Sequence, residues 1–341
     1  MATLTLTHGQ VYAFLNRKST GMQIRLYCQF WRVPHREVSV PMPKATLGNA
    51  AGSTLVSPTL HFLSLPGAKS DGPTMFYCHG GGYLHAMVYR GHIPIGLHLA
   101  RSCHASRLVF LEYTLTPYSY YPGQLAQIVE ATRYLIEQEG ISPDDLVLGG
   151  DSAGGHLVCG LLAHIVEPAA AIPRLDLQNK QLRAIALISP WLDMTGSGPS
   201  AMRNEKYDYL SRELLTALGI MFQPNMEHVW SEPINSPGAK ALWDRAFPKT
   251  AAGNSVAKRV MITAGEHEVL FDSCVNFATK LIGAEMVYMD GSMEAVEKIK
   301  RSRTVLVVGP SEVHVQCALD FVLRYHSGAT AVALGLFLES I

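Results

Sequence analysis

One serine of this chain lies in a sequence typical of a catalytic nucleophile. Ser152 is the centre of Gly150-Asp-Ser-Ala-Gly154, a G-x-S-x-G run between a short apolar segment and a helix-patterned one. A strand, a tight turn and a helix in that order expose a serine hydroxyl at a helix N-terminus, where the helix dipole favours negative charge. A phosphate-binding loop would need Lys and Ser/Thr where this chain has Gly155 and His156. The run therefore predicts a nucleophile.

A second glycine run, His79-Gly-Gly-Gly-Tyr83, follows another short apolar segment. Consecutive glycines accept positive φ and leave their amides accessible, so several N–H groups can point at one place. Acyl transfer needs such donors around the oxygen that becomes negative in its tetrahedral intermediate. Alone, three glycines are more often a flexible turn. Upstream of the Ser152 run, they predict an oxyanion hole.

The elements that must position these residues are indicated by hydrophobic periodicity. From about residue 60 onward, apolar runs of strand length alternate with segments whose apolar positions recur every three or four residues, which indicates a mostly parallel sheet. The expected strands are Leu60–Leu65, Met75–His79, Leu108–Tyr113, Leu146–Gly150, Ala184–Ser189, Val260–Ala264 and Thr304–Val308. The expected helices are Gly91–Cys103, Gly123–Glu139, Ala153–Ile165, Phe271–Ile282 and Val315–Tyr325. Glu285–Asp290 competes with Thr304–Val308 for the last strand, and we prefer the latter because a turn and a histidine follow it.

Two stretches interrupt the alternation, and we expect them to form a cap over the carboxyl edge of the sheet. Residues 1–50 contain clustered prolines, and residues 195–250 contain many turn signals without an obvious strand. We therefore assign 51–194 and 251–341 to one α/β core, and 1–50 and 195–250 to the cap.

With HGGG and GDSAGG in this order, the chain resembles the hormone-sensitive-lipase-like branch of the α/β-hydrolase superfamily, including fungal and plant carboxylesterases. The resemblance covers roughly residues 70–320. It implies an α/β-hydrolase fold, with helices on both faces of a mostly parallel sheet and a helical cap. It also implies that the amides of Gly81, Gly82 and Ala153 form the oxyanion hole.

In this family the catalytic serine is followed along the chain by an acid and then by a histidine. His314, in Gly309-Pro-Ser-Glu-Val-His, looks like the family's histidine loop, with His267 and His326 as rivals. Matching Glu268-Val-Leu-Phe-Asp272 to the family's D-P-L-x-D places Glu268 at the acid position, with Asp272 as its rival.

Composition excludes several other classes of protein. The 341 residues contain 28 Lys+Arg and 28 Asp+Glu, so the chain lacks the positive field of a nucleic-acid binder. No apolar run is long enough to cross a bilayer, and the first twenty residues lack the pattern of a secretory signal. The six cysteines are widely spaced, as expected for reduced core thiols. We expect a cytoplasmic protein without a membrane span or a nucleic-acid partner.

Neither a cofactor nor a metal is expected. His267-Glu268 begins like the zinc signature H-E-x-x-H, but Phe271 stands where the second imidazole must be.

We therefore predict a cofactor-free serine hydrolase of small or medium apolar carboxylic esters, with Ser152, His314 and Glu268 as its triad. Its role is expected in specialised metabolism. We assign substrate contacts to Tyr83 and to Trp230 of the cap. Two alternatives stay open: the same site used for elimination, cyclisation or acyl transfer, and an inactive fold that binds a small ligand as a receptor.

Overall fold

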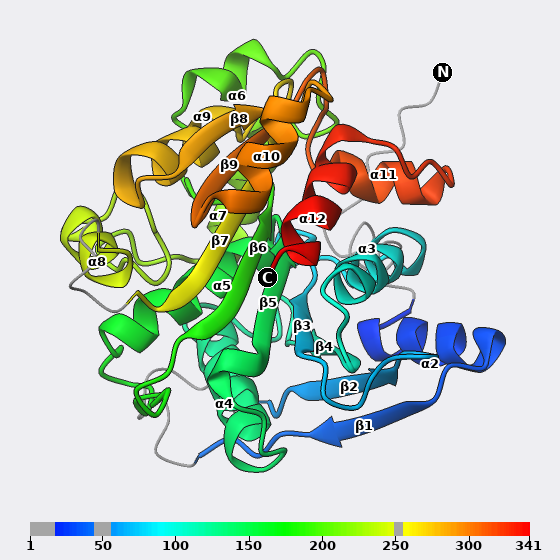
Figure 1. The fold of residues 1–341 in the computed structure, drawn as a ribbon. Helices are drawn as coiled ribbons and strands as arrows, with labels where there is room; N and C mark the ends of the chain where they lie inside the picture. Colours follow the sequence, from blue (N-terminus) through cyan, green and yellow to red (C-terminus); the bar gives the residue numbers. More distant parts are fainter. Residues whose placement is uncertain (1–17, 44–55, 249–254) are drawn as a thin grey trace, which may run out of the picture.

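A single nine-stranded sheet runs through the molecule, in the order β1-β2-β4-β3-β5-β6-β7-β9-β8 (Figure 1). This is a computed structural model, and it describes residues 18–43, 56–248 and 255–341. β1 and β2, and β2 and β4, pair antiparallel, whereas all other neighbours are parallel. The strands are β1 His35–Ser39, β2 Thr59–Ser64, β3 Thr74–Cys78, β4 Arg107–Glu112, β5 Leu146–Asp151, β6 Leu182–Ile188, β7 Ala257–Gly265, β8 Glu285–Tyr288 and β9 Thr304–Gly309.

Helices cover both faces of this sheet (Figure 1). The helices are α2 Thr20–Trp31, α3 Tyr89–Ser102, α4 Gly123–Glu137, α5 Ala153–Val166, α6 Pro199–Arg203, α7 Arg212–Phe222, α8 Ala239–Ala246, α9 Phe271–Val275, α10 Met293–Arg301, α11 Gln316–Val322 and α12 Ala329–Glu339. A short 3₁₀ turn, Pro143–Asp145, precedes β5, and a π-helical turn, Asn276–Leu281, continues α9. None of the helices in the described part of the chain is both long and apolar enough to span a membrane.

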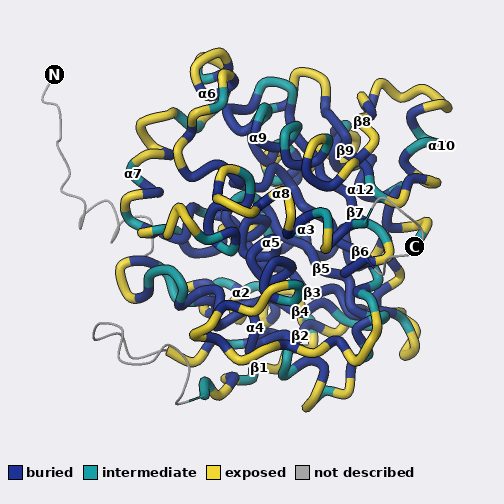
Figure 2. The backbone as a smooth tube through the Cα atoms, turned by 90° about the vertical axis from the view of Figure 1, so that its left-hand side faces the viewer, coloured by how far each residue is buried: buried dark blue, intermediate teal, exposed yellow. Residues whose placement is uncertain are grey.

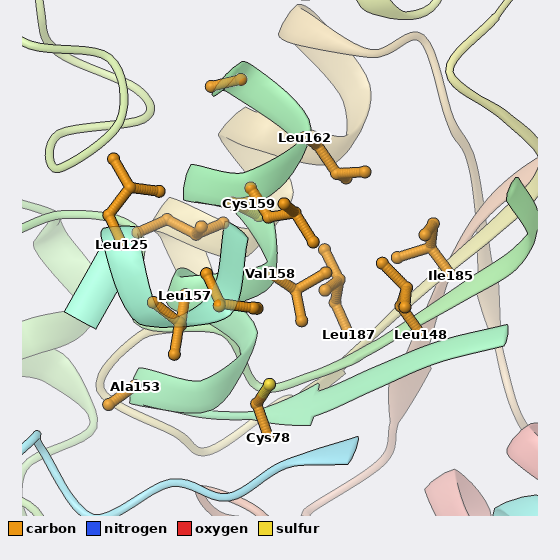
Figure 3. Packing of buried hydrophobic residues seen from close by; sticks show 14 of the residues in the cluster. Cys78, Leu125, Leu148, Ala153, Leu157, Val158, Cys159, Leu162, Ile185 and Leu187 are labelled. Carbon is orange, nitrogen blue, oxygen red and sulfur yellow. The ribbon is translucent and has the colours of Figure 1, made fainter. Parts of the chain in front are cut away.

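The core consists of two apolar clusters separated by the sheet. Alternate residues of a strand point to opposite faces, so Phe76 of β3 packs with α4 and α5 while Met75 packs with α3 and α12. Figure 3 shows one of these layers, where Val158 and Leu162 of α5 lie over side chains of β5 and β6. Figure 2 shows that the buried residues follow the central strands, whereas the edge strand β1 and the outer helices and loops carry the exposed ones. All six cysteines are free thiols buried in these layers.

The seven strands expected from the sequence are all present, and so are the five expected helices, each within a few residues of its predicted limits. Glu285–Tyr288 forms a strand as well, and β9 lies between β7 and this edge strand. The apolar segment Ala329–Glu339 forms α12, which packs on the core.

Part of the predicted cap belongs to the sheet. His35–Ser39, which the sequence placed in the cap, forms β1 and pairs with β2 at the edge of the sheet. This segment is exposed and polar, so it lacked the apolar pattern of the buried strands. Residues 1–17, 44–55 and 249–254 of the predicted cap and core lie outside the described residues. The remaining division into core and cap stays a prediction.

Candidate active site

Ser152 occupies a sharp turn between β5 and α5. Its backbone has φ 50° and ψ −119°, a region that non-glycine residues rarely adopt. Two hydrogen bonds hold this conformation: the Ser152 amide donates to Ile188 O at 2.9 Å, and its carbonyl accepts from Trp191 N at 3.0 Å. A Cβ at Gly154 would lie 2.0 Å from Cys78 O, so only glycine lets α5 begin this close to the end of β3. The motif therefore forms the turn that presents a nucleophile.

Asp151 joins the serine turn to the glycine loop. Its Oδ1 accepts hydrogen bonds from the Tyr77 hydroxyl at 2.6 Å and from the Gly80 amide at 3.0 Å. Its Oδ2 lies 3.2 Å from His92 Nε2. Burial opposes the charged forms of both groups, but their attraction outweighs it, lowering the pKa of Asp151 and raising that of His92. This buried ion pair holds the glycine loop beside Ser152.

The glycine loop has the backbone that the predicted oxyanion hole requires. Gly81 and Gly82 have φ of 108° and 60°, which glycine adopts at no steric cost. Within the described residues, neither amide donates to a protein acceptor. Ala153 is the first residue of α5, where amides have no partner inside the helix. These three N–H groups come from the two segments that Asp151 and Gly154 hold together.

Helix α2 also supports this loop. The hydroxyl of Thr20, at the start of α2, lies 3.1 Å from His79 Nε2 and accepts from Met87 N at 3.1 Å. His79 Nδ1 donates to Gly80 O, so Nε2 is the acceptor in the contact with Thr20. Burial, and secondarily the nearby His92, lowers the pKa of His79 to about 4. Neutral His79 thus links the glycine loop at Gly80 to Thr20 of α2, and Thr20 in turn binds Met87 on the far side of the loop.

The structure brings His314 and Glu268 together. Glu268 follows β7 and His314 follows β9, and these two strands are neighbours in the sheet. His314 Nδ1 lies 3.6 Å from Glu268 Oε2, and both side chains are buried. Neither atom has a hydrogen-bond partner within the described residues. Catalytic hydrogen bonds are often long before substrate binds. The pair has the arrangement of a base and its orienting acid.

The structure records no hydrogen bond from Ser152 Oγ within the described residues, and the link from His314 to the serine stays a prediction. The three residues follow β5, β7 and β9 at the carboxyl ends of parallel strands.

The rival residues lie elsewhere. Asp272 accepts from Ser200 N at 2.7 Å and pairs with Arg203 at 3.3 Å, so it is bound to α6. The ring of His267 stacks on Tyr207 at 4.5 Å, and His326 is exposed beyond α11.

Two residues that the sequence analysis missed hold the acid and base loops in place. Asp208 accepts from Val269 N at 2.8 Å and from His314 N at 3.4 Å, so one carboxylate reaches both loops. Asn204 Nδ2 donates to Glu268 O at 2.8 Å. Both come from the segment before α7, and their partners are backbone atoms, which leave no motif in a sequence.

We expect Asp208→Asn to lower kcat about tenfold, because an amide accepts more weakly from the two backbone N–H groups and the loops lose alignment. KM for the same ester should change less. Steady-state kinetics with a p-nitrophenyl ester measures both. Asp176→Asn is the matched control, since Asp176 accepts from Gln178 N at 2.8 Å in an exposed turn. Equal kcat values for the two variants would contradict the positioning role.

The two residues predicted to contact substrate occupy different places in the structure. Tyr83 is fully buried, its ring stacks on Phe222 at 4.2 Å, and it presents no surface to a ligand. Trp230 donates its indole N–H to Glu167 O at 2.8 Å. Glu167 follows the last residue of α5, a helix of 14 residues that spans about 21 Å from Ser152. Tyr83 is therefore a buried residue directly after the glycine loop, and the Trp230 indole packs at the far end of α5. The assignment of substrate contacts to these two residues stays a prediction.

His156 connects α5 to Tyr83 and to the segment before α8. It accepts from the Tyr83 hydroxyl through Nδ1 at 2.5 Å and donates through Nε2 to Ser231 O at 3.0 Å. Burial disfavours the charged ring and lowers the pKa of His156 to about 4. Because this pKa lies below the usual value of 6.5, the unfolded chain binds the proton more readily.

The contribution of His156 to the free energy of unfolding should therefore be fully present above about pH 6.5. It should fall by roughly 3 kcal/mol as the pH drops toward 4. Urea unfolding at pH 7 and pH 4.5 measures the fall. His156→Gln removes the titrating ring while keeping a donor and an acceptor, so its stability should depend less on pH. The same dependence in both proteins would contradict the assignment.

Comparison with known proteins agrees with this architecture. A family model described as alpha/beta hydrolase fold matches residues 75–289. Neutral cholesterol ester hydrolase 1 of Bos taurus is 28% identical over 283 residues, which cover 77% of this chain and 65% of that protein. An esterase of Acinetobacter venetianus is 26% identical, over 62% of each chain. The match thus spans less than two thirds of these relatives' own length. The crystal structure of an esterase from the bacterial hormone-sensitive lipase family superimposes with a TM-score of 0.64 at 23% identity, covering 96% of this chain and 94% of that one.

Proposed function

Because this chain belongs to the alpha/beta hydrolase fold family, we propose that it is a serine hydrolase of carboxylic esters. The fold class and the hormone-sensitive-lipase-like resemblance predicted from the sequence are confirmed, whereas the relation to fungal and plant carboxylesterases stays a prediction. The observation that carries the activity is the buried pair of Glu268 and His314, 3.6 Å apart, in loops at the same sheet edge as the strained Ser152 turn.

In the first half of the reaction, Ser152 Oγ attacks the acyl carbon and its proton passes to His314 Nε2. Glu268 stabilises the imidazolium through Nδ1. The carbonyl oxygen takes the electron pair and becomes an oxyanion, which accepts from the unpartnered amides of the glycine loop and of Ala153. When the C–O bond breaks, His314 returns the proton to the leaving alcohol, and an acyl-serine remains.

In the second half, water takes the place of the alcohol. His314 removes a proton from water as the oxygen attacks the acyl-serine, and the same amides hold the second oxyanion. Breaking the bond to Ser152 Oγ returns that proton to the serine and releases the carboxylic acid. The cycle uses only side chains and amides of this chain.

The substrate that we propose is a small or medium, largely apolar ester. A Cβ on Gly82 would lie 2.6 Å from Leu218 of α7, so apolar atoms of the predicted cap lie directly against the oxyanion loop. The names of the relatives, an esterase and a cholesterol ester hydrolase, support an ester substrate. A role in tailoring a specialised metabolite stays a prediction.

A panel of p-nitrophenyl esters with acyl chains of increasing length tests the activity, and a fluorophosphonate probe followed by mass mapping tests the nucleophile. We expect turnover and a single label on Ser152. Labelling of another residue, or an unlabelled and inactive folded protein, would contradict the proposal.

Chelation should leave ester turnover unchanged, because every step above is assigned to residues of the chain. The measurement is kcat at 25 °C before and after treatment with EDTA and dialysis. Lost turnover that added zinc restores, in a stripped protein whose circular dichroism shows it to be folded, would contradict this mechanism.

A further inference from the structure

Three side chains with metal-ligating atoms converge on the two outermost strands at the β1 edge of the sheet. His35 and Glu37 belong to β1, and His61 belongs to β2. His35 Nε2 lies 3.1 Å from His61 Nδ1, and Glu37 Oε1 lies 3.7 Å from the same nitrogen. One ligand atom from each of the three residues lies within 4.8 Å of the others.

The sheet itself fixes this arrangement. In the antiparallel register, Glu37 is directly opposite His61. His35 stands two residues before Glu37, so the strand pleat places it on the same face of the sheet. The rings of His35 and His61 stack with centroids 5.3 Å apart and an interplanar angle of 7°. Side chains on paired strands are held more precisely than side chains on loops.

A fourth residue, Glu112 at the end of β4, orients the buried histidine. Glu112 Oε2 lies 2.9 Å from His61 Nε2, and the His61 side chain has no exposed surface. The carboxylate accepts the Nε2 proton, so Nδ1 presents its lone pair toward His35 and Glu37. Glu112 is held in turn by the amide of Gly21 in α2, at 2.8 Å. A histidine whose other nitrogen donates to a carboxylate is the usual arrangement around a protein-bound metal.

We propose that His35, Glu37 and His61 bind one divalent transition-metal ion of the zinc type. Two imidazoles and one carboxylate are a common ligand set for Zn²⁺, with water in the fourth position. Two nitrogens bound to one tetrahedral zinc lie about 3.3 Å apart, close to the 3.1 Å between His35 and His61. When the ion binds, the proton that His35 Nε2 donates to His61 Nδ1 moves to His35 Nδ1, and both histidines then bind the ion as neutral imidazoles.

The surroundings allow the ion to enter. The Glu37 side chain is 31% exposed, whereas His61 lies beneath it. Arg25 of α2 donates to both oxygens of Glu37, to Oε2 at 2.9 Å and to Oε1 at 3.2 Å. The Arg25 side chain is 53% exposed, and pairs of this kind contribute little to stability. A metal on Oε1 would replace the longer of these two bonds and leave the shorter one, to Oε2, in place.

The expected role is structural. In the sheet, β2 is three strands from β5, which corresponds to about 14 Å, so the ion would lie apart from Ser152. It would bind β1 to β2 directly and to β4 through Glu112. The expected effect is on stability, because the ion binds only the folded protein.

The experiment uses the full chain, stripped with EDTA and dialysed. Titration with Zn²⁺ alone in a calorimeter, with metal analysis after gel filtration, should give one ion per chain and a higher Tm. Glu37→Gln keeps the shape of an exposed side chain and should weaken binding about 100-fold, and Glu112→Gln about 10- to 100-fold. His98→Gln, which changes a histidine bonded to Ala331 O, is the matched control and should bind like the wild type.

His61→Gln should abolish binding, and circular dichroism shows whether that variant folds. If it does not fold, the zinc affinity of Glu37→Gln, compared with that of the wild type, tests the site instead. Binding of equal strength in the wild type and in folded Glu37→Gln would overturn the proposal. So would the absence of binding by the stripped wild type at 100-fold excess of zinc.

Discussion

Replacing Ser152 with alanine is expected to lower kcat by about 10⁴- to 10⁶-fold while the protein stays folded. The alanine keeps the Cβ and so takes the same positive φ at no new steric cost, while the attacking oxygen is lost. The residual rate would come from the oxyanion amides and substrate binding alone. Steady-state hydrolysis of a p-nitrophenyl ester measures the effect, and circular dichroism checks the fold.

Ser236→Ala provides the matched control, since Ser236 is also buried and its hydroxyl donates to Glu232 O at 2.6 Å. It should keep wild-type kcat. Hydrolysis at a near wild-type rate by folded Ser152→Ala would refute the nucleophile assignment.

Glu268→Gln is the second change with a large expected effect, a fall in kcat of about 10³- to 10⁴-fold. Glutamine has the size of glutamate but no charge, so the imidazolium that forms on His314 loses its stabilising partner. Its amide can also turn an N–H toward Nδ1, which favours the wrong tautomer. The pH dependence of kcat/KM, recorded with the same ester, should also differ between Glu268→Gln and the wild type, because Glu268 stabilises the charged form of His314.

Asp272→Asn separates the two acids that the sequence left open. Asp272 faces Ser200 and Arg203, so its loss should cost about 1 kcal/mol of stability or less and leave kcat within a few-fold. If the two folded variants gave the reverse order of kcat values, the role of the acid would pass to Asp272.

The buried strands could be predicted because each is a short apolar run between turn signals. β3 and β9 are apolar along nearly their whole length, as expected for strands covered on both faces. β1 has the sequence His35-Arg-Glu-Val-Ser39 and is mostly exposed. Its place in the sheet depends on pairing with a strand more than twenty residues later, which no local pattern shows.

The site could be predicted to the extent that it is local. The turn at Ser152 and the glycine loop are continuous motifs, so their backbone conformations follow from residue type. Glu268 and His314 required the resemblance to a family, since only the sheet brings them together. Asp208 accepts from backbone amides, which leave no sequence motif. The role of Trp230 stays a prediction, because an aromatic residue in a cap can face the core as well as a ligand.

The proposed metal ligands were missed for a related reason. The search for metal sites from sequence relied on helical spacing, in which two ligands stand four residues apart. His35 and Glu37 stand two apart, as on a strand, and His61 is added only by the antiparallel register.

The position of β9 between β7 and β8 has a consequence for synthesis on the ribosome. β8 emerges before β9 yet has no partner until Thr304–Gly309 arrives, and the edge of β7 stays open in the nascent chain for the same interval. An unpaired apolar strand edge is a template for association with other chains. We therefore expect the nascent chain to expose this strand edge to other chains until Thr304–Gly309 has been made. A chain truncated before β9 would be lost to aggregation as well as lacking His314.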